Sequence, residues 1–335
     1  MRDWLGHGIV VAVGIALLVL LPAQAQLYTI INATIWTAMA TLALSLGLVW
    51  GYGGILCLGQ TAFFGLGGYA YAVAAINLGN STWAVPLAIA TPAVFAAALG
   101  YFLFYGRLGE VYLGIVTLTV SLILFKLANS TSGPEYTIGS ARLGGANGMP
   151  KTPFLNAPFD PAVLLSPDTI FRVVLGALLL CYLFCLWLLH SRFGHVTLAI
   201  RENQQRVELL GYDARRHKLL LFVIGGAIAG VAGIGFANSA FISPALFSLA
   251  TTAQVIIWVI VGGLGTLFGP ILGAVVVQAL MSWLGTLAQV HPALSRLDPN
   301  LVLGAALILF VLLLPRGLWP AVTSLAGRLR RGPGR

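Results

Sequence analysis

The stretch HSRFGHVTLAIRENQQRVELLGYDARRHK, residues His190–Lys218, is a polar island between two long apolar runs. A stretch this charged cannot lie in hydrocarbon, and its excess of Lys and Arg over Asp and Glu is typical of the cytoplasmic side of a membrane. The island is also longer than a minimal turn between two helices, which indicates a contact surface for another protein. Its basic residues are Arg192, Arg201, Arg206, Arg215, Arg216 and Lys218.

The composition of the whole chain places it in a membrane. Of the 335 residues, 59% are hydrophobic and 8% are charged, whereas a soluble domain carries about 25% charged residues. The sequence therefore predicts an all-α polytopic membrane protein, because the alternating short segments of a transmembrane barrel are missing. The net charge of +9 does not indicate a nucleic-acid partner, since the basic residues lie in loops beside apolar runs. The three cysteines have no metal-ligand spacing, so we expect no metal site.

Apolar runs divide the chain into about ten transmembrane helices that form a single domain over residues 1–335. Ten spans with an internal N-terminus leave both termini inside and place most Lys and Arg residues on that side. The predicted spans are Trp4–Pro22, Tyr28–Trp50, Thr61–Asn77, Trp83–Tyr105, Val111–Leu127, Thr169–Leu189, Leu219–Asn238, Ala253–Val261, Ile271–Leu284 and Leu301–Leu314.

Two features of this count have alternatives. Residues 1–26 resemble a signal peptide as well as a first span, because Ala23-Gln24-Ala25 looks like a cleavage site; we favour the span. The run Ala253–Val261 is short for a span, and a re-entrant segment there would give nine spans. Residues 129–168 form the one long loop expected outside, a candidate periplasmic docking surface, and residues 316–335 form a basic cytoplasmic tail.

Two glycine-rich segments interrupt the apolar pattern: GYGGILCLGQTAFFGLGGYAY at Gly51–Tyr71 and GGLGTLFGPILG at Gly262–Gly273. Broken helix at membrane depth is tolerated where it lines a cavity or packs within protein. We therefore expect a translocation path along these segments, with close helix packing as the alternative. The path residues that we expect are Gly59, Gln60, Phe63, Phe64, Gly262, Gly263 and Gly265.

The polar island has a helical pattern of its own. Val196, Ile200, Val207 and Leu210 share one face of a predicted amphipathic helix. Gly211 is placed to end this helix and the following aspartate to cap the next one. Such a helix lies either on the lipid surface or in a socket of another protein, and its scattered acids favour the socket.

The sequence lacks the residue patterns expected for ion coupling, ATP hydrolysis or catalysis within the membrane. No Asp or Glu falls within a predicted span, which disfavours a proton- or sodium-coupled carrier. No G-x-x-x-x-G-K-[ST] phosphate loop is present, so the chain cannot hydrolyse ATP by itself. A membrane-embedded enzyme is disfavoured because no catalytic set lies within the spans. We expect no catalytic residue and no cofactor.

Four segments together resemble a known family. They are the two glycine-rich segments, the run AIREN at Ala199–Asn203 and the run ELLG at Glu208–Gly211. In the same order they look like segments in permease subunits of branched-chain amino acid ABC importers, a family shared with urea and short-chain amide importers. Two positions depart from the family pattern: Cys57 stands where serine is frequent, and Gln60 where histidine is common.

The resemblance implies a bacterial inner-membrane permease. Its partners would be a second homologous permease, two cytoplasmic ATPases and a periplasmic solute-binding protein, all assembled in the lipid bilayer. It also implies a branched-chain or hydrophobic amino acid, or a related small solute, as cargo; the alternative is a stand-alone carrier or channel for a small neutral solute such as urea or an amide. The implied ATPase-coupling residues are Arg201, Glu202, Asn203, Arg206, Glu208 and Gly211.

Overall fold

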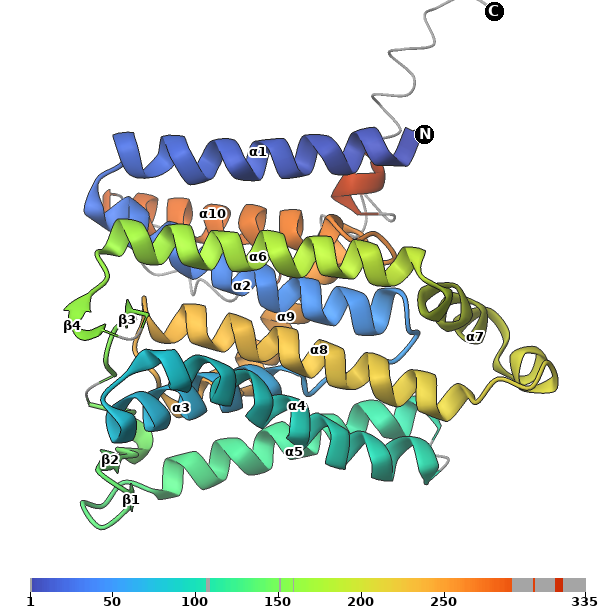
Figure 1. The fold of residues 1–335 in the computed structure, drawn as a ribbon, viewed down its shortest axis with the longest axis horizontal. Helices are drawn as coiled ribbons and strands as arrows, with labels where there is room; N and C mark the ends of the chain where they lie inside the picture. Colours follow the sequence, from blue (N-terminus) through green and yellow to red (C-terminus); the bar gives the residue numbers. More distant parts are fainter. Residues whose placement is uncertain are drawn as a thin grey trace, which may run out of the picture.

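The computed structural model describes residues 2–106, 109–150, 152–158, 160–290, 304 and 317–321. Within these ranges, eight helices are long and apolar enough to cross a membrane, and they lie side by side with their ends at two faces of one bundle (Figure 1). This confirms the predicted all-α membrane class. The eight helices are α1 (Arg2–Gln24), α2 (Leu27–Gly51), α3 (Gln60–Leu78), α4 (Ser81–Tyr105), α5 (Glu110–Ser130), α6 (Pro167–His190), α8 (Ala214–Ala237) and α10 (Gly269–Val290).

The two remaining predicted spans have different outcomes. The eighth apolar run lies in α9 (Leu249–Gly262), a helix of 14 residues that is shorter than a full span. The tenth run, Leu301–Leu314, lies outside the described residues except for Gly304. Within the described residues there are therefore eight apolar helices of membrane length and one shorter apolar helix, where the sequence predicts about ten spans.

The two ends of the bundle differ in character. One end carries α7 (Arg192–Leu209), which holds most of the polar island and projects beyond the long helices; the N-terminus lies at the same end (Figure 1). The other end carries residues 131–166, which include two short antiparallel strand pairs that the sequence did not predict. The strands are β1 (Thr137–Ile138), β2 (Ala141–Arg142), β3 (Asn156–Ala157) and β4 (Asp160–Leu164), and a short 3-10 turn, η1 (Gly145–Asn147), lies between β2 and β3.

Polar contacts hold this strand-bearing loop on the helix ends. The backbone N–H of Leu155 donates to Oδ1 of Asn238 at the end of α8, over 2.7 Å. The backbone N–H of Ser81, at the start of α4, donates to Oδ1 of Asn156 over 2.7 Å. Because both amide side chains are buried, these contacts fix the loop to the bundle instead of leaving it free in solvent.

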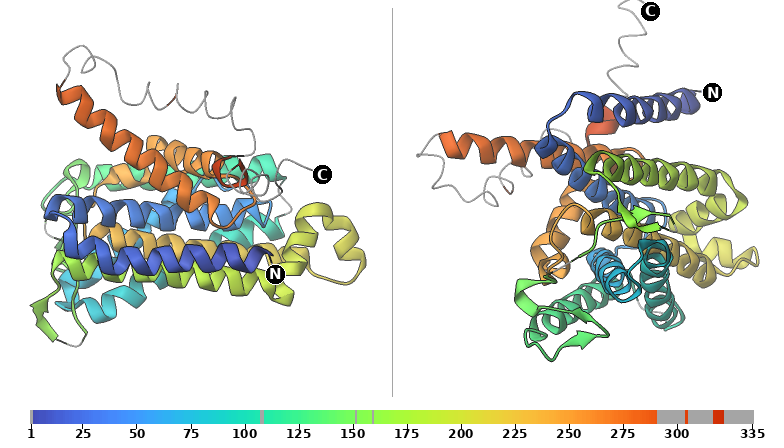
Figure 2. Two further views of the ribbon diagram at one scale, coloured as in Figure 1. Left: turned by 90° about the horizontal axis from the view of Figure 1, so that it is seen from above. Right: turned by 60° about the vertical axis from the view of Figure 1, so that its left-hand side comes forward.

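The core of the bundle is built around α8, which packs on α2, α3 and α4. The backbones of α8 and α3 are in close contact. A Cβ atom added at Gly67 of α3 would lie 2.6 Å from the Cα of Gly230 of α8. Small residues allow this separation, which is typical of helices that associate in lipid. The helices α1 and α10 lie at the edge of the bundle (Figure 2), and α1 is packed along α6.

Candidate functional site

The first glycine-rich segment forms a break between α2 and α3. The chain leaves α2 at Gly51, is not helical from 52 to 59, and starts α3 at Gln60. Gly54 has a positive φ of 66°, which favours glycine. A Cβ atom at Gly59 would lie 2.2 Å from the carbonyl oxygen of Thr117, so only glycine fits beside α5 there. We call residues 52–59 the first break.

A chain of neutral polar side chains is buried where the first break meets α3. Nε2 of Gln60 donates to Oγ of Ser45 (2.9 Å) and to the carbonyl oxygen of Gly225 (3.1 Å). The hydroxyl of Thr61 shares hydrogen bonds with Ser121 (3.1 Å) and Thr252 (2.8 Å). We call Ser45, Gln60, Thr61, Ser121 and Thr252 the polar seam; it joins α2, α3, α5 and α9.

The polar seam is buried and leaves no room for solvent. Each of its five side chains is nearly fully buried. It borders a narrow space beside Cys57 and Val255 that is too small to hold a water molecule. Oε1 of Gln60 has no hydrogen-bond partner among the described residues. An unpaired buried acceptor costs free energy, so this position favours an arrangement in which Oε1 finds a donor.

The two predicted path phenylalanines lie deeper in the packed core. The ring of Phe63 contacts Phe222 of α8 edge-on, with ring centroids 5.2 Å apart, and Phe64 contacts Phe236 in the same way at 5.6 Å. Both side chains are fully buried. The structure therefore brings Gly59 and Gln60 to the polar seam and places Phe63 and Phe64 against α8.

The second glycine-rich segment forms another break, between α9 and α10. Gly263 and Gly265 have positive φ angles of 118° and 84°, and α10 starts at Gly269. A Cβ atom at Gly262 would lie 1.9 Å from the carbonyl oxygen of Gly269, so α9 and α10 approach through their backbones. We call residues 263–268 the second break. A Cβ atom at Gly51 would lie 3.1 Å from the backbone nitrogen of Gly265, so the last residue of α2, next to the first break, adjoins the second break.

The projecting helix α7 is kinked, whereas the sequence predicted one continuous amphipathic helix. Asn203 has non-helical angles (φ −157°, ψ 94°), and its Oδ1 accepts from the backbone N–H of Arg206 over 3.0 Å. Asn203 therefore acts as an N-cap for a second short helical segment. Gly211, with φ 88°, turns the chain, and Asp213 caps α8, as predicted. Ile200 and Val207 pack with Ala214 inside this hairpin.

The tip of this hairpin exposes apolar side chains. Leu209 is 88% exposed and Leu210 is 76% exposed, although the sequence pattern placed Leu210 on the packed face. The neighbouring Glu208 and Gly211 are also exposed. We call residues 208–212 the tip. Two adjacent exposed leucines at the end of a projecting helix form an apolar surface patch.

Arg201, one of the predicted coupling residues, has its side chain directed toward the end of α2. Its Nη1 donates to the carbonyl oxygen of Gly51, at the end of α2. Arg201 is exposed, as are Glu202, Asn203 and Arg206, but its side chain also reaches from α7 to the end of α2. Sequence reasoning missed this contact, as well as the exposure of the two leucines.

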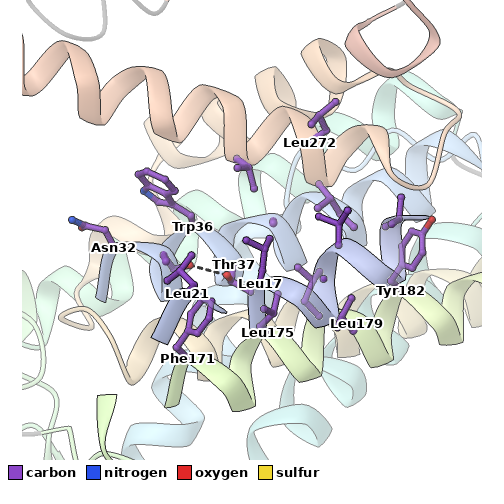
Figure 3. Close-up of a pocket in the computed structure, with 18 of the residues that line it drawn as sticks. Leu17, Leu21, Asn32, Trp36, Thr37, Phe171, Leu175, Leu179, Tyr182 and Leu272 are labelled. Carbon is purple, nitrogen blue, oxygen red and sulfur yellow. Dashed lines mark hydrogen bonds between the residues drawn. The ribbon is translucent and has the colours of Figure 1, made fainter. Parts of the chain in front are cut away.

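A third feature is an apolar groove of about 470 Å³ between α1, α2, α6 and α10. Leu17 of α1, Trp36 of α2 and Phe171 of α6 point into it, and Leu272 of α10 closes the far wall (Figure 3). The groove contains none of the predicted path residues. Within the described residues, no group of three His, Cys, Asp or Glu side chains lies close enough to hold a metal ion.

A bundle of membrane-length helices with two glycine-rich breaks and a projecting polar helix defines a membrane permease. The sequence profile of the family "Branched-chain amino acid transport system / permease component" matches residues 28–313. The chain belongs to this family, which confirms the predicted class of permease subunit and the expectation of a non-catalytic membrane component.

Individual relatives agree with the family. The chain is 32% identical over 338 residues to the high-affinity branched-chain amino acid transport system permease protein LivM of Escherichia coli (strain K12), covering 91% of this chain and 74% of that protein. It is 28% identical over 251 residues to the probable branched-chain amino acid transport permease protein LivM of Methanocaldococcus jannaschii, covering 68% of each chain. No solved structure gives a significant match.

Proposed function

We propose that this chain is the permease subunit of an ATP-driven importer in the bacterial cytoplasmic membrane, and that it moves a branched-chain or other hydrophobic amino acid inward. The observation that carries the proposal is the exposed tip with Leu209 and Leu210. A permease that lacks a nucleotide site needs a docking surface for its motor. The tip supplies apolar anchor residues, which commonly dominate the binding energy of protein interfaces.

The partners follow from this surface and from the family. Two ATPase subunits bind α7 and that of a second, homologous permease, and a periplasmic binding protein delivers the solute to the opposite end. The predicted coupling residues Glu202, Asn203, Arg206, Glu208 and Gly211 are exposed on the same projection as the two leucines. A polar rim around an apolar centre is the usual anatomy of a protein interface.

The orientation in the membrane is supported by charge. The polar island is rich in Lys and Arg, which favours the cytoplasm for the α7 end. The N-terminus lies at that end (Figure 1). Gly317 lies there too, because a Cβ atom added to it would lie 2.4 Å from the Cα of Gly263 in the second break. We therefore propose that both termini are cytoplasmic and that residues 129–168 face the periplasm.

The translocation path runs along the two breaks in this proposal. Gly59 and Gln60 form its wall at the polar seam, and Gly262, Gly263 and Gly265 form its wall at the α9–α10 turn. The seam offers hydroxyl and amide groups without any Asp, Glu, Lys, Arg or His, which suits a solute without net charge. The space beside the seam has no room for water, which supports a closed state of this proposed path.

Gln60→Leu tests the seam. Leucine has a similar volume but cannot donate to Ser45 or Gly225, so we expect uptake per assembled complex to fall about tenfold while the free energy of unfolding changes by about 1 kcal/mol. Gln60→His keeps a ring N–H donor and is expected to retain more uptake. The measurements are radiolabelled leucine uptake and a thermal melt in detergent. Unchanged uptake in the leucine variant would remove Gln60 from the path.

Reconstitution distinguishes the importer from a stand-alone carrier or channel. We expect the purified chain alone in liposomes to move no leucine or urea down a gradient. The complex with the ATPases, the second permease and the binding protein is expected to accumulate leucine only when ATP is supplied to the ATPase side. Transport by the purified chain alone, without nucleotide, would contradict the proposed function.

A further inference from the structure

One side chain of α7 contacts both breaks. Nη1 of Arg201 donates to the carbonyl oxygen of Gly51, where α2 gives way to the first break. A Cβ atom added to Gly54, within that break, would lie 3.0 Å from Cγ of Arg201. A Cβ atom added to Gly265, in the second break, would lie 3.8 Å from Nη1. Three glycines on two separate segments therefore surround a single arginine.

The last backbone carbonyl groups of α2 all have hydrogen-bond donors, and Arg201 supplies the donor for Gly51. The carbonyl oxygens of Leu48, Val49 and Trp50 accept from backbone N–H groups of residues 52 to 55 as the chain turns into the first break. The carbonyl of Gly51 instead accepts from Arg201. The C-terminal end of a helix carries partial negative charge, so a guanidinium is a favourable partner for this carbonyl.

The contact connects α7 with the polar seam through a short stretch of irregular backbone. From Gly51 the chain runs through the first break to Gln60, and the N–H of Leu58 is held by Oγ1 of Thr117 (3.1 Å). The second break joins α9, which carries Thr252 of the seam, to α10. A displacement of Arg201 is therefore expected to act on the end of α2, on the first break at Gly54 and on the second break, which follows α9.

We propose that Arg201 is the positioning residue through which movement of α7 changes the conformation of both breaks and opens the polar seam. This inference rests on the proposed function, because it takes the ATPases as the source of the movement. It also gives Arg201 a role different from that of the tip: Arg201 is hydrogen-bonded to the permease at Gly51, whereas the tip faces the ATPase.

Cys57 supplies a direct reporter, because it lies in the first break, is 1% exposed and borders the seam. In a chain with Cys181→Ala and Cys185→Ala, the rate of Cys57 modification by N-ethylmaleimide is measured in the full complex. We expect ATP with the leucine-loaded binding protein to raise this rate about tenfold, a coupling of ordinary size. Arg201→Ala is expected to abolish the acceleration while ATPase assembly is retained.

Three variants make the test specific. Arg201→Lys keeps the charge and a donor long enough to reach Gly51, so it should retain most of the acceleration. Arg192→Ala removes a positive charge from an exposed position of the same helix and should behave as wild type. Gly54→Ala displaces Arg201 from the first break without altering the sequence of α7. The positive φ at residue 54 adds strain to the alanine. This variant should therefore reduce the acceleration of Cys57 modification, as Arg201→Ala does.

The outcomes separate this inference from the proposed function. If the wild-type complex moves leucine with ATP and Arg201→Ala shows normal acceleration at Cys57, the role of Arg201 is overturned and the importer stands. If the Arg201→Ala permease fails to assemble with the ATPases, Gly54→Ala becomes the deciding variant. A normal acceleration of Cys57 modification in Gly54→Ala would then overturn the inference. If the wild-type complex neither binds ATPases nor uses ATP, the proposed function itself fails.

Discussion

We expect the double substitution Leu209→Asp, Leu210→Asp to abolish binding of the ATPase subunits and, with it, all ATP-dependent uptake. Both side chains are exposed at the tip, so the permease loses little packing when they change. Burial of one leucine at an interface contributes about 2 kcal/mol, a factor of about 30 in affinity. Loss of two leucines, with two carboxylates to desolvate in their place, weakens binding by a factor of about a thousand or more.

Pull-down of the ATPases by the purified permease measures this effect, together with a thermal melt that reports on the fold. Leu78→Asp is the matched control, because Leu78 is 51% exposed at the end of α3 and lies at the opposite end of the bundle. It should bind the ATPases as wild type does. Normal ATPase binding by the double variant would show that the tip is not the docking surface.

The second large effect concerns stability. Gly67→Val should prevent the bundle from folding, since a Cβ atom at Gly67 would lie 2.6 Å from the Cα and 2.8 Å from the carbonyl oxygen of Gly230. These are backbone atoms and cannot rotate away. Overpacking of flexible side chains already costs about 1–3 kcal/mol, so forcing α3 and α8 apart should cost more than about 3 kcal/mol. Size-exclusion profiles in mild detergent report the loss of folded protein.

Gly176→Ala is the control for helical glycine in general. A Cβ atom at Gly176 on α6 meets nothing within 4 Å, so alanine fits without displacement. Because alanine favours helix by about 1 kcal/mol over glycine, this variant should be as stable as wild type or more stable. A folded Gly67→Val chain with a wild-type melting temperature would contradict the observed α3–α8 contact.

Much of the fold could be predicted from the sequence because apolar length fixes membrane helices. The limits of α2 and α6 lie within two residues of the predicted apolar runs, whereas α8 begins at Ala214, five residues before its apolar run. The turn at Gly211 and the cap at Asp213 could be predicted because both are local effects of a few residues. The strand pairs of the loop at residues 131–166 could not, since β1, β2 and β3 have only two residues each and cannot produce an alternating pattern.

The candidate site was predicted less completely, because its contacts join segments that are distant in sequence. Glycine content located the two breaks, yet nothing in either segment shows that they adjoin at Gly51 and Gly265. The hydroxyl partners of Thr61 come from α5 and α9, and no local pattern distinguishes Ser121 from an ordinary lipid-facing serine. Likewise, the family resemblance assigned Arg201 to ATPase coupling, and no local pattern indicates its contact with Gly51, which is 150 residues away in sequence.

The glycine contacts of α8 determine which parts of the permease move as a rigid body. Backbone contact at Gly67 and Gly230, together with the close approach of Gly225 to Val49, fastens α2 and α3 to α8. In contrast, the seam hydrogen bond between α9 and α3 runs through the single hydroxyl of Thr61. Opening should therefore swing α9 away from the stationary block of α2, α3 and α8, with residues 263–268 as its hinge.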